Sequence, residues 1–290
     1  MTVPRIGIAG ASDERVLGAA RKLVAGGRVC PVLVGAAPEL PGVPGLLPEP
    51  GQSDVDALAE LVGRGEVAAG VAGTVATSAS VIRTGIRRLA PRGLVTGCFA
   101  IRHVEGWKTY ADCSVIPAPT SEQLAEIGEA AADHHAHLFG EPARVAMLSF
   151  STDGSAEHPD VLKVREATRL LRARRPELQL AGEVQFDVAV DGATGRRKLP
   201  GSDVAGRANV LIFPDLDAGN IAYKVAERVG RARALGSFVL NLSRPWVDLS
   251  RGCAEADIVD TVLLLADALR RSVPHGTGRD AALATVEESP

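Results

Sequence analysis

The sequence predicts an α/β fold of doubly wound, mostly parallel sheets. Short apolar runs of strand length alternate with amphipathic runs of helical period along most of the chain, a pattern typical of β–α–β units. Of the 290 residues, 46% are hydrophobic, and 31 glycines and 18 prolines supply turns between the elements. This length suits one large domain or two modest ones.

The first half of the chain opens with an expected strand at Arg5–Ala9 and a helix at Asp13–Ala25, whose apolar residues recur at helical spacing. Further strands are expected at Val29–Val34, Val67–Val71 and Gly93–Ile101, and further helices at Ser53–Val62, Ala79–Leu89 and Thr120–Leu138. The last of these begins T-S-E-Q, in which a capping hydroxyl precedes an acid in the first turn. The proline-rich Ala36–Gln52 is expected to form no regular element.

The second half continues the alternation. Strands are expected at Arg144–Ser149, Val184–Val190, Val210–Phe213 and Ser237–Leu242, and helices from Ile221 onward and at Asp257–Leu269. The polar, glycine-rich Asp191–Ser202 is expected to be a loop. After Arg271 the sequence has no hydrophobic period, and we expect a mobile tail there.

The composition excludes several classes of function. A net charge of -3 without any Lys/Arg run gives no reason to expect nucleic acid as a partner. No apolar stretch reaches the ~20 residues that span a bilayer, and the N-terminus lacks the layout of a signal peptide. The 4 cysteines are scattered without a CxxC pair, so reduced thiols are expected rather than disulfides or a zinc site. We therefore expect a soluble cytoplasmic protein with no membrane partner.

Polar side chains gather at two places in residues 200–257. An apolar strand that ends at Phe213 is followed by a turn rich in acids and glycine, Pro214–Asn220, and open α/β sheets bind ligands beyond the carboxyl ends of their strands. Ser250, Arg251 and Asp257 lie within eight residues, on a loop that leads into a helix. Their hydroxyl, guanidinium and carboxylate form a candidate set for anion binding and proton transfer.

These two motifs, FPDLDAGNIAYK and DLSRGC, resemble the phosphate acetyl/butyryl transferase family, the phosphotransacetylases. The likeness extends over most of residues 65–270 through ADCSVIPAPTSEQLAEI (111–127), VAMLSFSTDGSAEHPDVLKVREA (145–167) and GEVQFDVAV (182–190). The resemblance implies transfer of a short acyl group, acetyl first, between coenzyme A and inorganic phosphate, without a metal or prosthetic group. It also implies a homodimer of two-domain chains, with 1–95 plus 240–290 as one domain, 96–239 as the other and the substrate cleft between them.

The resemblance also implies roles for individual residues. Asp257 takes the proton of the coenzyme A thiol as it attacks the acyl phosphate, Ser250 stabilises the intermediate, and Arg251 and Arg83 bind the phosphoryl group. From the residues alone, Asp257 is equally an acid in a first helical turn, where the helix dipole favours it. Arg251 could instead form an ion pair, quite possibly with Asp257 itself.

The remaining candidates are expected to bind substrate. Thr74 lies in a loop that leads into a helix, a natural anion site. A hydroxyl-rich turn contains Ser151, Thr152 and Gly154, and could cradle phosphate or be a simple capped turn. Asp217 and Asn220 belong to the acidic turn after the Val210–Phe213 strand, and Cys253 is expected close to the acyl site.

Some features depart from the family pattern or are discounted. The family stretch L-R-K-x-K-G, with its second functional arginine, has no equivalent here, and Asp153 stands where a lysine is usual. An acyl-CoA hydrolase, a transferase to another acceptor and a non-catalytic acyl-CoA sensor therefore remain alternatives. GIAGAS (7–12) lacks the spacing of a nucleotide loop, and the histidines of 133–137 are more typical of a polar helix face than of a metal site.

Overall fold

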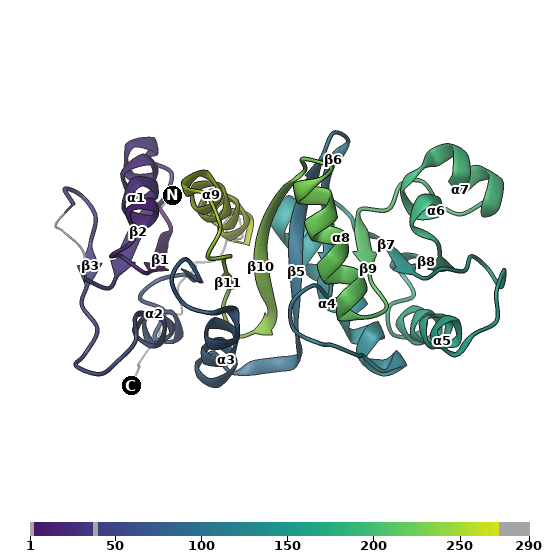
Figure 1. The fold of residues 1–290 in the computed structure, drawn as a ribbon, viewed down its shortest axis with the longest axis horizontal. Coiled ribbons are helices and arrows are strands. Elements are labelled where there is room, and N and C mark those ends of the chain that lie inside the picture. The colour runs from purple at the N-terminus through teal and green to yellow at the C-terminus, as the bar shows by residue number, and fades with distance from the viewer. Residues whose placement is uncertain (1–2, 37–39, 273–290) are drawn as a thin grey trace, which may run out of the picture.

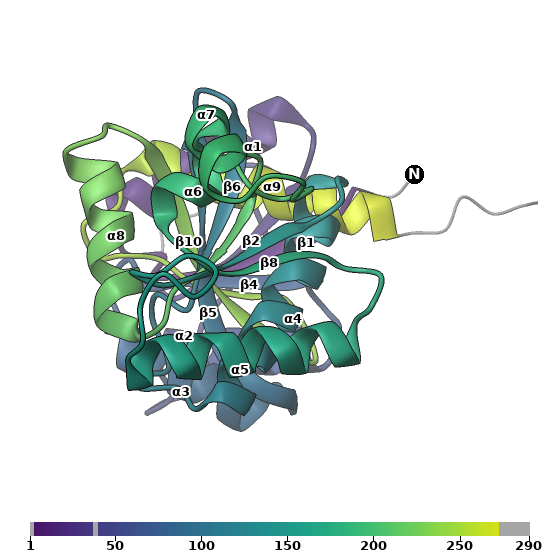
Figure 2. The same cartoon turned by 90° about the vertical axis from the view of Figure 1, so that its right-hand side faces the viewer.

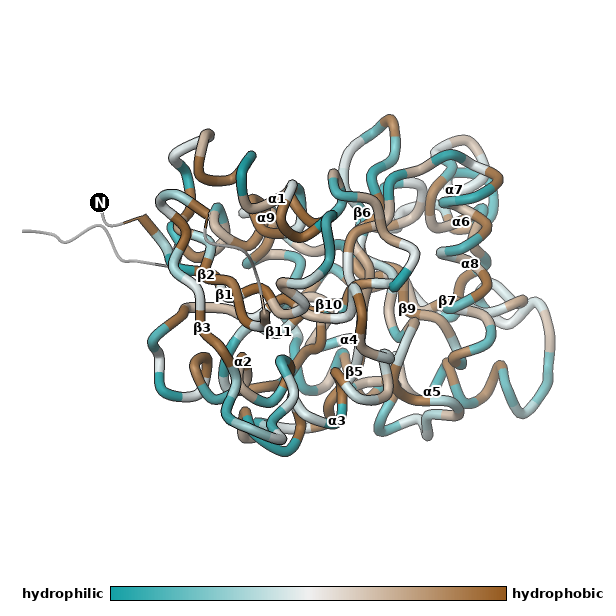
Figure 3. The backbone as a smooth tube through the Cα atoms, turned by 60° about the vertical axis from the view of Figure 1, so that its left-hand side comes forward, coloured by the Kyte–Doolittle hydropathy of each residue, from teal (hydrophilic) through white to brown (hydrophobic). Residues whose placement is uncertain are grey.

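A computed structural model describes residues 3–36 and 40–272 of the chain. It confirms the α/β fold: in the described residues, 11 strands join in one mixed, mostly parallel sheet with helices on both faces (Figures 1 and 2). Hydrophobic residues concentrate along strands such as those near the N-terminus, and hydrophilic ones in the outer loops (Figure 3). The tail expected to be mobile lies outside the described residues from 273 onward.

One half of the sheet is built from both ends of the chain. Its elements are β1 (Arg5–Ala9), α1 (Glu14–Gly26), β2 (Cys30–Val34), β3 (Gly45–Leu46), α2 (Asp54–Gly63), β4 (Ala69–Ala72), α3 (Ser78–Arg88), β11 (Trp246–Asp248) and α9 (Glu255–Ser272). The Asp13 carboxylate caps α1 by accepting a hydrogen bond from the Arg15 N–H at 2.9 Å. Gly27 ends that helix in the left-handed region at φ 63, where glycine is favoured.

The middle and the other half come from the centre of the chain. They comprise β5 (Pro91–His103), β6 (Gly106–Ala111), α4 (Ser121–Phe139), β7 (Arg144–Leu148), α5 (Pro159–Arg174), β8 (Gln179–Val184), α6 (Phe186–Val190), α7 (Gly192–Lys198), β9 (Val210–Ile212), α8 (Leu216–Arg228) and β10 (Arg233–Leu242). The cap expected for α4 is confirmed as a capping box between Thr120 and Gln123.

Strand direction reverses across the middle of the sheet. The order is β3-β2-β1-β4-β11-β10-β5-β6-β9-β7-β8, and β10 is antiparallel to both of its neighbours, as β6 is to β5. The strands β6, β9, β7 and β8 therefore run opposite to β1, β2, β4 and β11. Loops that follow β4 and β11 emerge at one end of the strands, here termed the Ser250 end. Loops that follow β9 and β7 emerge at the opposite end.

Four of the expected assignments are wrong. The proline-rich Ala36–Gln52, expected to form no regular element, contains the two-residue strand β3, which pairs in parallel with β2. The helix expected to begin at Ile221 begins at Leu216, capped by the Asp215 carboxylate. The strand expected at Val184–Val190 ends at Val184, and Phe186–Val190 is the helix α6, which buries Val188 and Ala189 against the sheet. The expected loop Asp191–Ser202 contains the helix α7, capped by the Asp191 carboxylate, which accepts from the Thr194 N–H at 2.7 Å. The alternating apolar pattern of 184–190 thus reflects burial of a short helix.

The two predicted domains share the sheet. Both predicted boundaries, at 95/96 and 239/240, fall inside the long strands β5 and β10, which pair with each other in the middle of the sheet. The division into domains stays a prediction.

Helices cover both faces of the sheet. The helices α1, α9 and α4 follow one another along one face, and α2, α3 and α8 along the other (Figures 1 and 2).

Candidate active site

The loop between β11 and α9 borders a cavity of about 130 Å³ at the Ser250 end. Ser250, Cys253 and Asp257, all predicted as site residues, line it. The other walls come from the start of β10, from Phe99 of β5 and from the later turns of α8. Segments far apart in the sequence therefore meet here, and they bring a hydroxyl, a thiol and a carboxylate to one cavity.

Asp257 caps the start of α9 and forms an ion pair. Its Oδ2 accepts a hydrogen bond from the Ala254 N–H at 2.8 Å, and its Oδ1 lies 3.3 Å from Nη2 of Arg233. Arg233 also pairs with Asp260. The Asp257 side chain remains 28% exposed, so a ligand in the cavity can reach the carboxylate. The ion-pair partner of Asp257 is thus Arg233, and not the neighbouring Arg251 as the sequence suggested.

Ser250 and Arg251 are exposed in the turn before α9. Ser250 Oγ accepts from the Gly252 N–H at 3.2 Å and donates to no described residue, so its hydroxyl proton is available to a ligand. The Arg251 guanidinium makes no hydrogen bond or ion pair with the described part of the chain. An available donor beside an unpaired cation suits an anionic ligand.

Arg15 anchors the turn that contains Ser250 and Arg251. Its guanidinium donates to the backbone carbonyls of Arg251 at 2.8 Å, Cys253 at 2.7 Å and Thr74 at 3.1 Å. Asp13 orients it through contacts of 2.7 Å and 3.0 Å, and the hydrogen bonds to Arg15 lower the pKa of Asp13. Arg15 therefore joins the loop after β4 to the loop after β11.

Thr74 lies beside the Ser250 loop, as these contacts require. Gly73 adopts φ 105 and packs so closely that a Cβ there would lie 2.2 Å from the Leu249 carbonyl oxygen. Thr74 is 3% exposed, and its Oγ1 has no hydrogen-bond partner among the described residues. Arg83, further along α3, is exposed, forms no hydrogen bond or ion pair with residues 3–36 and 40–272, and does not line the 130 Å³ cavity.

Asp248 is a buried carboxyl two residues before Ser250. It is 4% exposed, and burial raises its pKa to about 6 against the opposing hydrogen bond from Ser78. Its Oδ1 has no hydrogen-bond partner among the described residues and packs against Gly73, where a Cβ would lie 2.6 Å from it. Asp248 is the first residue of the DLSRG motif, and this position could have marked it as a site residue. The sequence does not show, however, that its side chain is buried.

Charged side chains of both signs on α8 also line the cavity. Lys224 and Arg228 lie one turn apart, and Glu227 between them pairs with Arg228 at 3.2 Å. Cys253 is not a thiolate there, because burial raises its pKa to about 11 despite the nearby Arg15. A negatively charged ligand would thus meet the Lys224 ammonium and a protonated thiol.

Thr261 completes the polar side of the cavity. It lies one helical turn after Asp257 on α9, is fully buried, and its Oγ1 has no partner among the described residues. Thr261 is not among the predicted site residues, although its four-residue spacing from Asp257 places both on one helix face. Arg15 is not among them either; it belongs to a D-x-R sequence that follows the glycine turn of residues 7–12.

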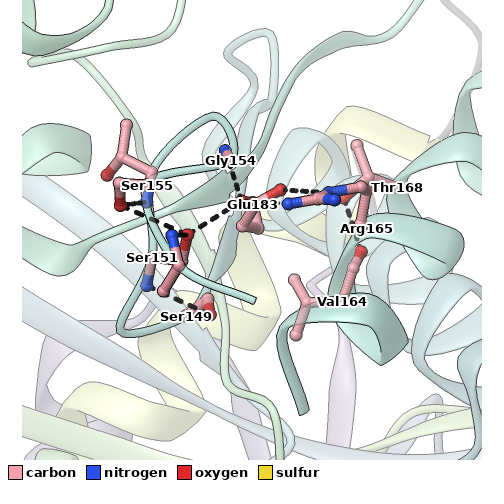
Figure 4. A network of polar contacts seen from close by, with 10 residues as sticks. Ser149, Ser151, Gly154, Ser155, Val164, Arg165, Thr168 and Glu183 are labelled. Carbon is pink, nitrogen blue, oxygen red and sulfur yellow. Dashed lines mark hydrogen bonds and ion pairs between the residues drawn. The ribbon is translucent and has the colours of Figure 1, made fainter. Parts of the chain in front are cut away.

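The hydroxyl-rich turn after β7 emerges at the opposite end of the strands and does not line this cavity. There the Ser151 hydroxyl at 3.0 Å and the Gly154 N–H at 2.9 Å both donate to the buried carboxylate of Glu183 (Figure 4). Arg165 adds two hydrogen bonds at 3.1 Å. Burial would raise the pKa of Glu183, but Arg165 and the other donors lower it to about 2. The Thr152 hydroxyl accepts a hydrogen bond from the backbone N–H of Gln185 at 3.0 Å. The polar groups of this turn are therefore already hydrogen-bonded within the protein.

Asp217 and Asn220 also lie away from the cavity. They belong to the first turns of α8, at the opposite end of the strands, where Asn220 donates to the Cys113 carbonyl at 3.1 Å. Asp217 is exposed. Because α8 runs back along the sheet, its later residues, beginning with Tyr223, reach the Ser250 end. The helix contributes to the cavity, but through residues other than those predicted.

The histidines of α4 point to separate places. His135 is fully buried and contacts the Thr109 hydroxyl at 2.9 Å, while His134 packs on the Phe238 ring with centroids 5.0 Å apart. Burial lowers the pKa of both imidazoles to about 3, so both are neutral. Within the described ranges no group of three or more His, Cys, Asp or Glu side chains is arranged to hold a metal ion.

Comparison with known proteins points to one family. The model of the family described as phosphate acetyl/butaryl transferase matches residues 53–266. A phosphate acetyltransferase of Paracoccus denitrificans is 38% identical, over 88% of this chain and 91% of its own length. One from Nitratidesulfovibrio vulgaris is 44% identical over 71% of this chain, but the match spans only 30% of that longer protein.

A solved structure has the same fold. A phosphotransacetylase from Streptococcus pyogenes superimposes with a TM-score of 0.80 at 31% sequence identity, covering 92% of this chain and 94% of the other. Among the residues that the structure describes, no helix combines the length and apolar character needed to cross a membrane.

Proposed function

Because the chain belongs to the phosphate acetyl/butyryl transferase family, we propose that it transfers a short acyl group between coenzyme A and inorganic phosphate. The observation that carries this proposal is the meeting of Ser250, Asp257 and Lys224 in one cavity. The names of the relatives support the same chemistry. Coenzyme A enters as a substrate, and we propose no metal or prosthetic group because the reaction balances without one.

In the proposed mechanism the thiol of coenzyme A attacks the carbonyl carbon of an acyl phosphate. Asp257 accepts the thiol proton as the carbon–sulfur bond forms, since a thiol of pKa ~8.5 is mostly protonated at neutral pH. Ser250 donates a hydrogen bond to the developing oxyanion. The carbon–oxygen bond then breaks, and phosphate leaves toward the positive charge of Arg251, with Arg83 as a further phosphoryl contact. The reverse reaction forms acyl phosphate from acyl-CoA.

For Asp257 to act as base, its ion pair must loosen. Arg233 holds Oδ1 in the described state, and Asp260 offers Arg233 a second partner on the next turn of α9. A shift of Arg233 fully onto Asp260 would free Oδ1 without leaving a cation unpaired. Under this proposal Asp257 acts as the base without any backbone movement.

One observation favours a second candidate, hydrolysis of acyl-CoA or transfer to another acceptor. Arg83 does not line the cavity that contains Ser250 and Asp257, and the hydroxyl-rich turn binds Glu183 instead of offering donors to phosphate. A weak phosphate site would let water or another nucleophile take the acyl group.

The test is a panel of acyl-CoAs assayed with and without phosphate. Phosphate-dependent loss of the thioester absorbance, reversed by acyl phosphate and coenzyme A, supports the transferase. Release of coenzyme A that is independent of phosphate supports the second candidate. Ligand-induced stabilisation without turnover would instead indicate a sensor. We further propose that the chain is cytoplasmic and forms a homodimer. Light scattering of the purified chain checks the oligomeric state.

A further inference from the structure

Helix α8 carries apolar side chains toward solvent as well as toward the sheet. Ile221, Val225 and Val229, here termed the α8 row, follow one another at intervals of four residues and are 60%, 51% and 77% exposed. Within α8, all of whose residues are described, Gly219 is the one buried residue. In Figures 1 and 2 no described element lies over the outer side of this helix. A helix that is apolar around so much of its circumference is typical of one covered on both sides.

The α8 row has the geometry to pack against a second copy of itself. Side chains four residues apart form the ridges that interdigitate when two helices cross at about −50°. Ile221 and Val229 lie at equal distances along the chain from Val225. A two-fold axis at Val225 would therefore set Val225 against its own counterpart, and Ile221 against Val229 of the partner subunit. Dimers with two-fold symmetry use one patch on both copies in this way.

The charges beside the α8 row favour a second copy as the occupant. Asp217 lies one helical turn before Ile221, Arg231 lies two residues after Val229, and both side chains are exposed. Neither the Asp217 carboxylate nor the Arg231 guanidinium forms a hydrogen bond or ion pair with residues 3–36 and 40–272. The two-fold arrangement brings the acidic end of each α8 beside the basic end of the other. Asp217 and Arg231 would then pair across the contact twice, once on each side of the axis.

We propose that the α8 row is a dimer interface, in which two copies of this chain pair their α8 helices antiparallel about an axis at Val225. This inference rests on the homodimer of the proposed function and names the surface that forms it. It also assigns a role to Asp217, which the sequence predicted to bind substrate and which lies away from the cavity. Because α8 lines the 130 Å³ cavity through Tyr223 and Lys224, the active sites of the dimer would lie on either side of this interface.

The test measures the dissociation constant of the dimer by sedimentation equilibrium for the parent, Val225→Asp and Leu162→Asp. Leu162 is a matched control, since it is 47% exposed on α5, which packs against α4 on the opposite face of the sheet. Val225→Asp would place two carboxylates against each other in an apolar contact, so we expect the dimer to weaken at least ~100-fold. Leu162→Asp should leave the dissociation constant unchanged. A Val225→Asp chain that dimerises as tightly as the parent would overturn the inference.

Exchange of the charges tests the antiparallel arrangement. Asp217→Arg and Arg231→Asp, each made alone, should weaken the dimer about 10-fold, because each turns two attractive pairs into like-charge contacts. The two substitutions together reverse both signs and should restore the dissociation constant of the parent. Single variants without effect, or a double variant as weak as the single ones, would refute this arrangement.

A cross-link keeps the surface testable if Val225→Asp does not accumulate as folded protein. Mild oxidation of Val225→Cys should give a disulfide-linked dimer in a non-reducing gel, since this position lies on the axis, where the two sulfurs can meet. Leu162→Cys and the parent, which has 4 cysteines of its own, should give none. A dimeric Val225→Cys chain that does not cross-link would refute the surface.

The outcomes separate this inference from the proposed function. A parent that stays monomeric refutes the homodimer and the α8 interface together, whereas a dimeric parent with an equally dimeric Val225→Asp refutes the interface alone. Dimerisation is measured without any acyl substrate. Failure of acyl transfer would therefore leave the dissociation constants as the evidence for or against the interface.

Discussion

Glu183→Gln separates a structural role of the hydroxyl-rich turn from a role in phosphate binding. The Glu183 side chain is 2% exposed and accepts hydrogen bonds from Ser151, Gly154 and Arg165. Its pKa of about 2, compared with an ordinary value of 4.5, corresponds by linkage to about 3 kcal/mol of folding free energy at neutral pH. Arg165 is 44% exposed, so solvent screening reduces the expected loss in the variant to about 2 kcal/mol.

The sign of the pH dependence follows from the lowered pKa. A carboxyl with a depressed pKa in the folded state stabilises the protein above its unfolded pKa, and this stabilisation disappears as pH falls through the folded pKa. The free energy of unfolding of the parent should therefore fall between about pH 5 and about pH 2, and that of Glu183→Gln should fall less in the same range. Urea unfolding followed by circular dichroism at several pH values measures both slopes.

Glu166→Gln is the matched control, because Glu166 pairs with Arg169 on the surface of α5, where ion pairs contribute little. It should leave the unfolding free energy indistinguishable from that of the parent. Equal pH slopes for the parent and Glu183→Gln would refute the linkage argument. A large rise in the KM for phosphate in Glu183→Gln, with stability unchanged, would instead return the turn to the phosphate site.

Three further substitutions test the proposed site. Asp257→Asn should retain the fold and coenzyme A binding but lower kcat by ~10²–10⁴, and a rate within a few-fold of the parent would remove Asp257 from the mechanism. Arg83→Ala should raise the KM for phosphate with little effect on the KM for coenzyme A, because loss of one charge-assisted contact to phosphate costs about 1.5–3 kcal/mol of binding free energy. The reverse pattern would indicate that Arg83 contacts coenzyme A instead. Arg15→Met should release the Ser250 loop and reduce kcat at least ~10-fold, whereas Arg21→Met, on the exposed side of the same helix, should not; steady-state kinetics of both variants decide whether loop anchoring matters.

The elements that the sequence predicted correctly have strong local signals. The helix after Thr120 is marked by its capping box, and the strand Arg5–Ala9 by a continuous apolar run that the sheet buries. The prediction failed at Val184–Val190, where alternation of apolar residues suits a strand as well as a short buried helix. Strand β11, three residues long, is too short for any periodic signal, yet it carries the loop with Ser250.

By itself, the sequence determined the α/β class, the family and the local group of Ser250, Arg251 and Asp257, because these depend on periodicity and on residues close together in the chain. Only the tertiary structure decided which other side chains share their cavity. The antiparallel strands β10 and β6 reverse the direction of half the sheet, so turns that follow β7 and β9 emerge at the end opposite Ser250. For that reason Ser151 and Asp217 lie away from the cavity, while Phe99 and Thr261, which no motif marks, line it together with Tyr223 near the end of the FPDLDAGNIAYK motif. Strand direction is set by pairing between segments distant in the chain, and no local pattern of residues encodes it.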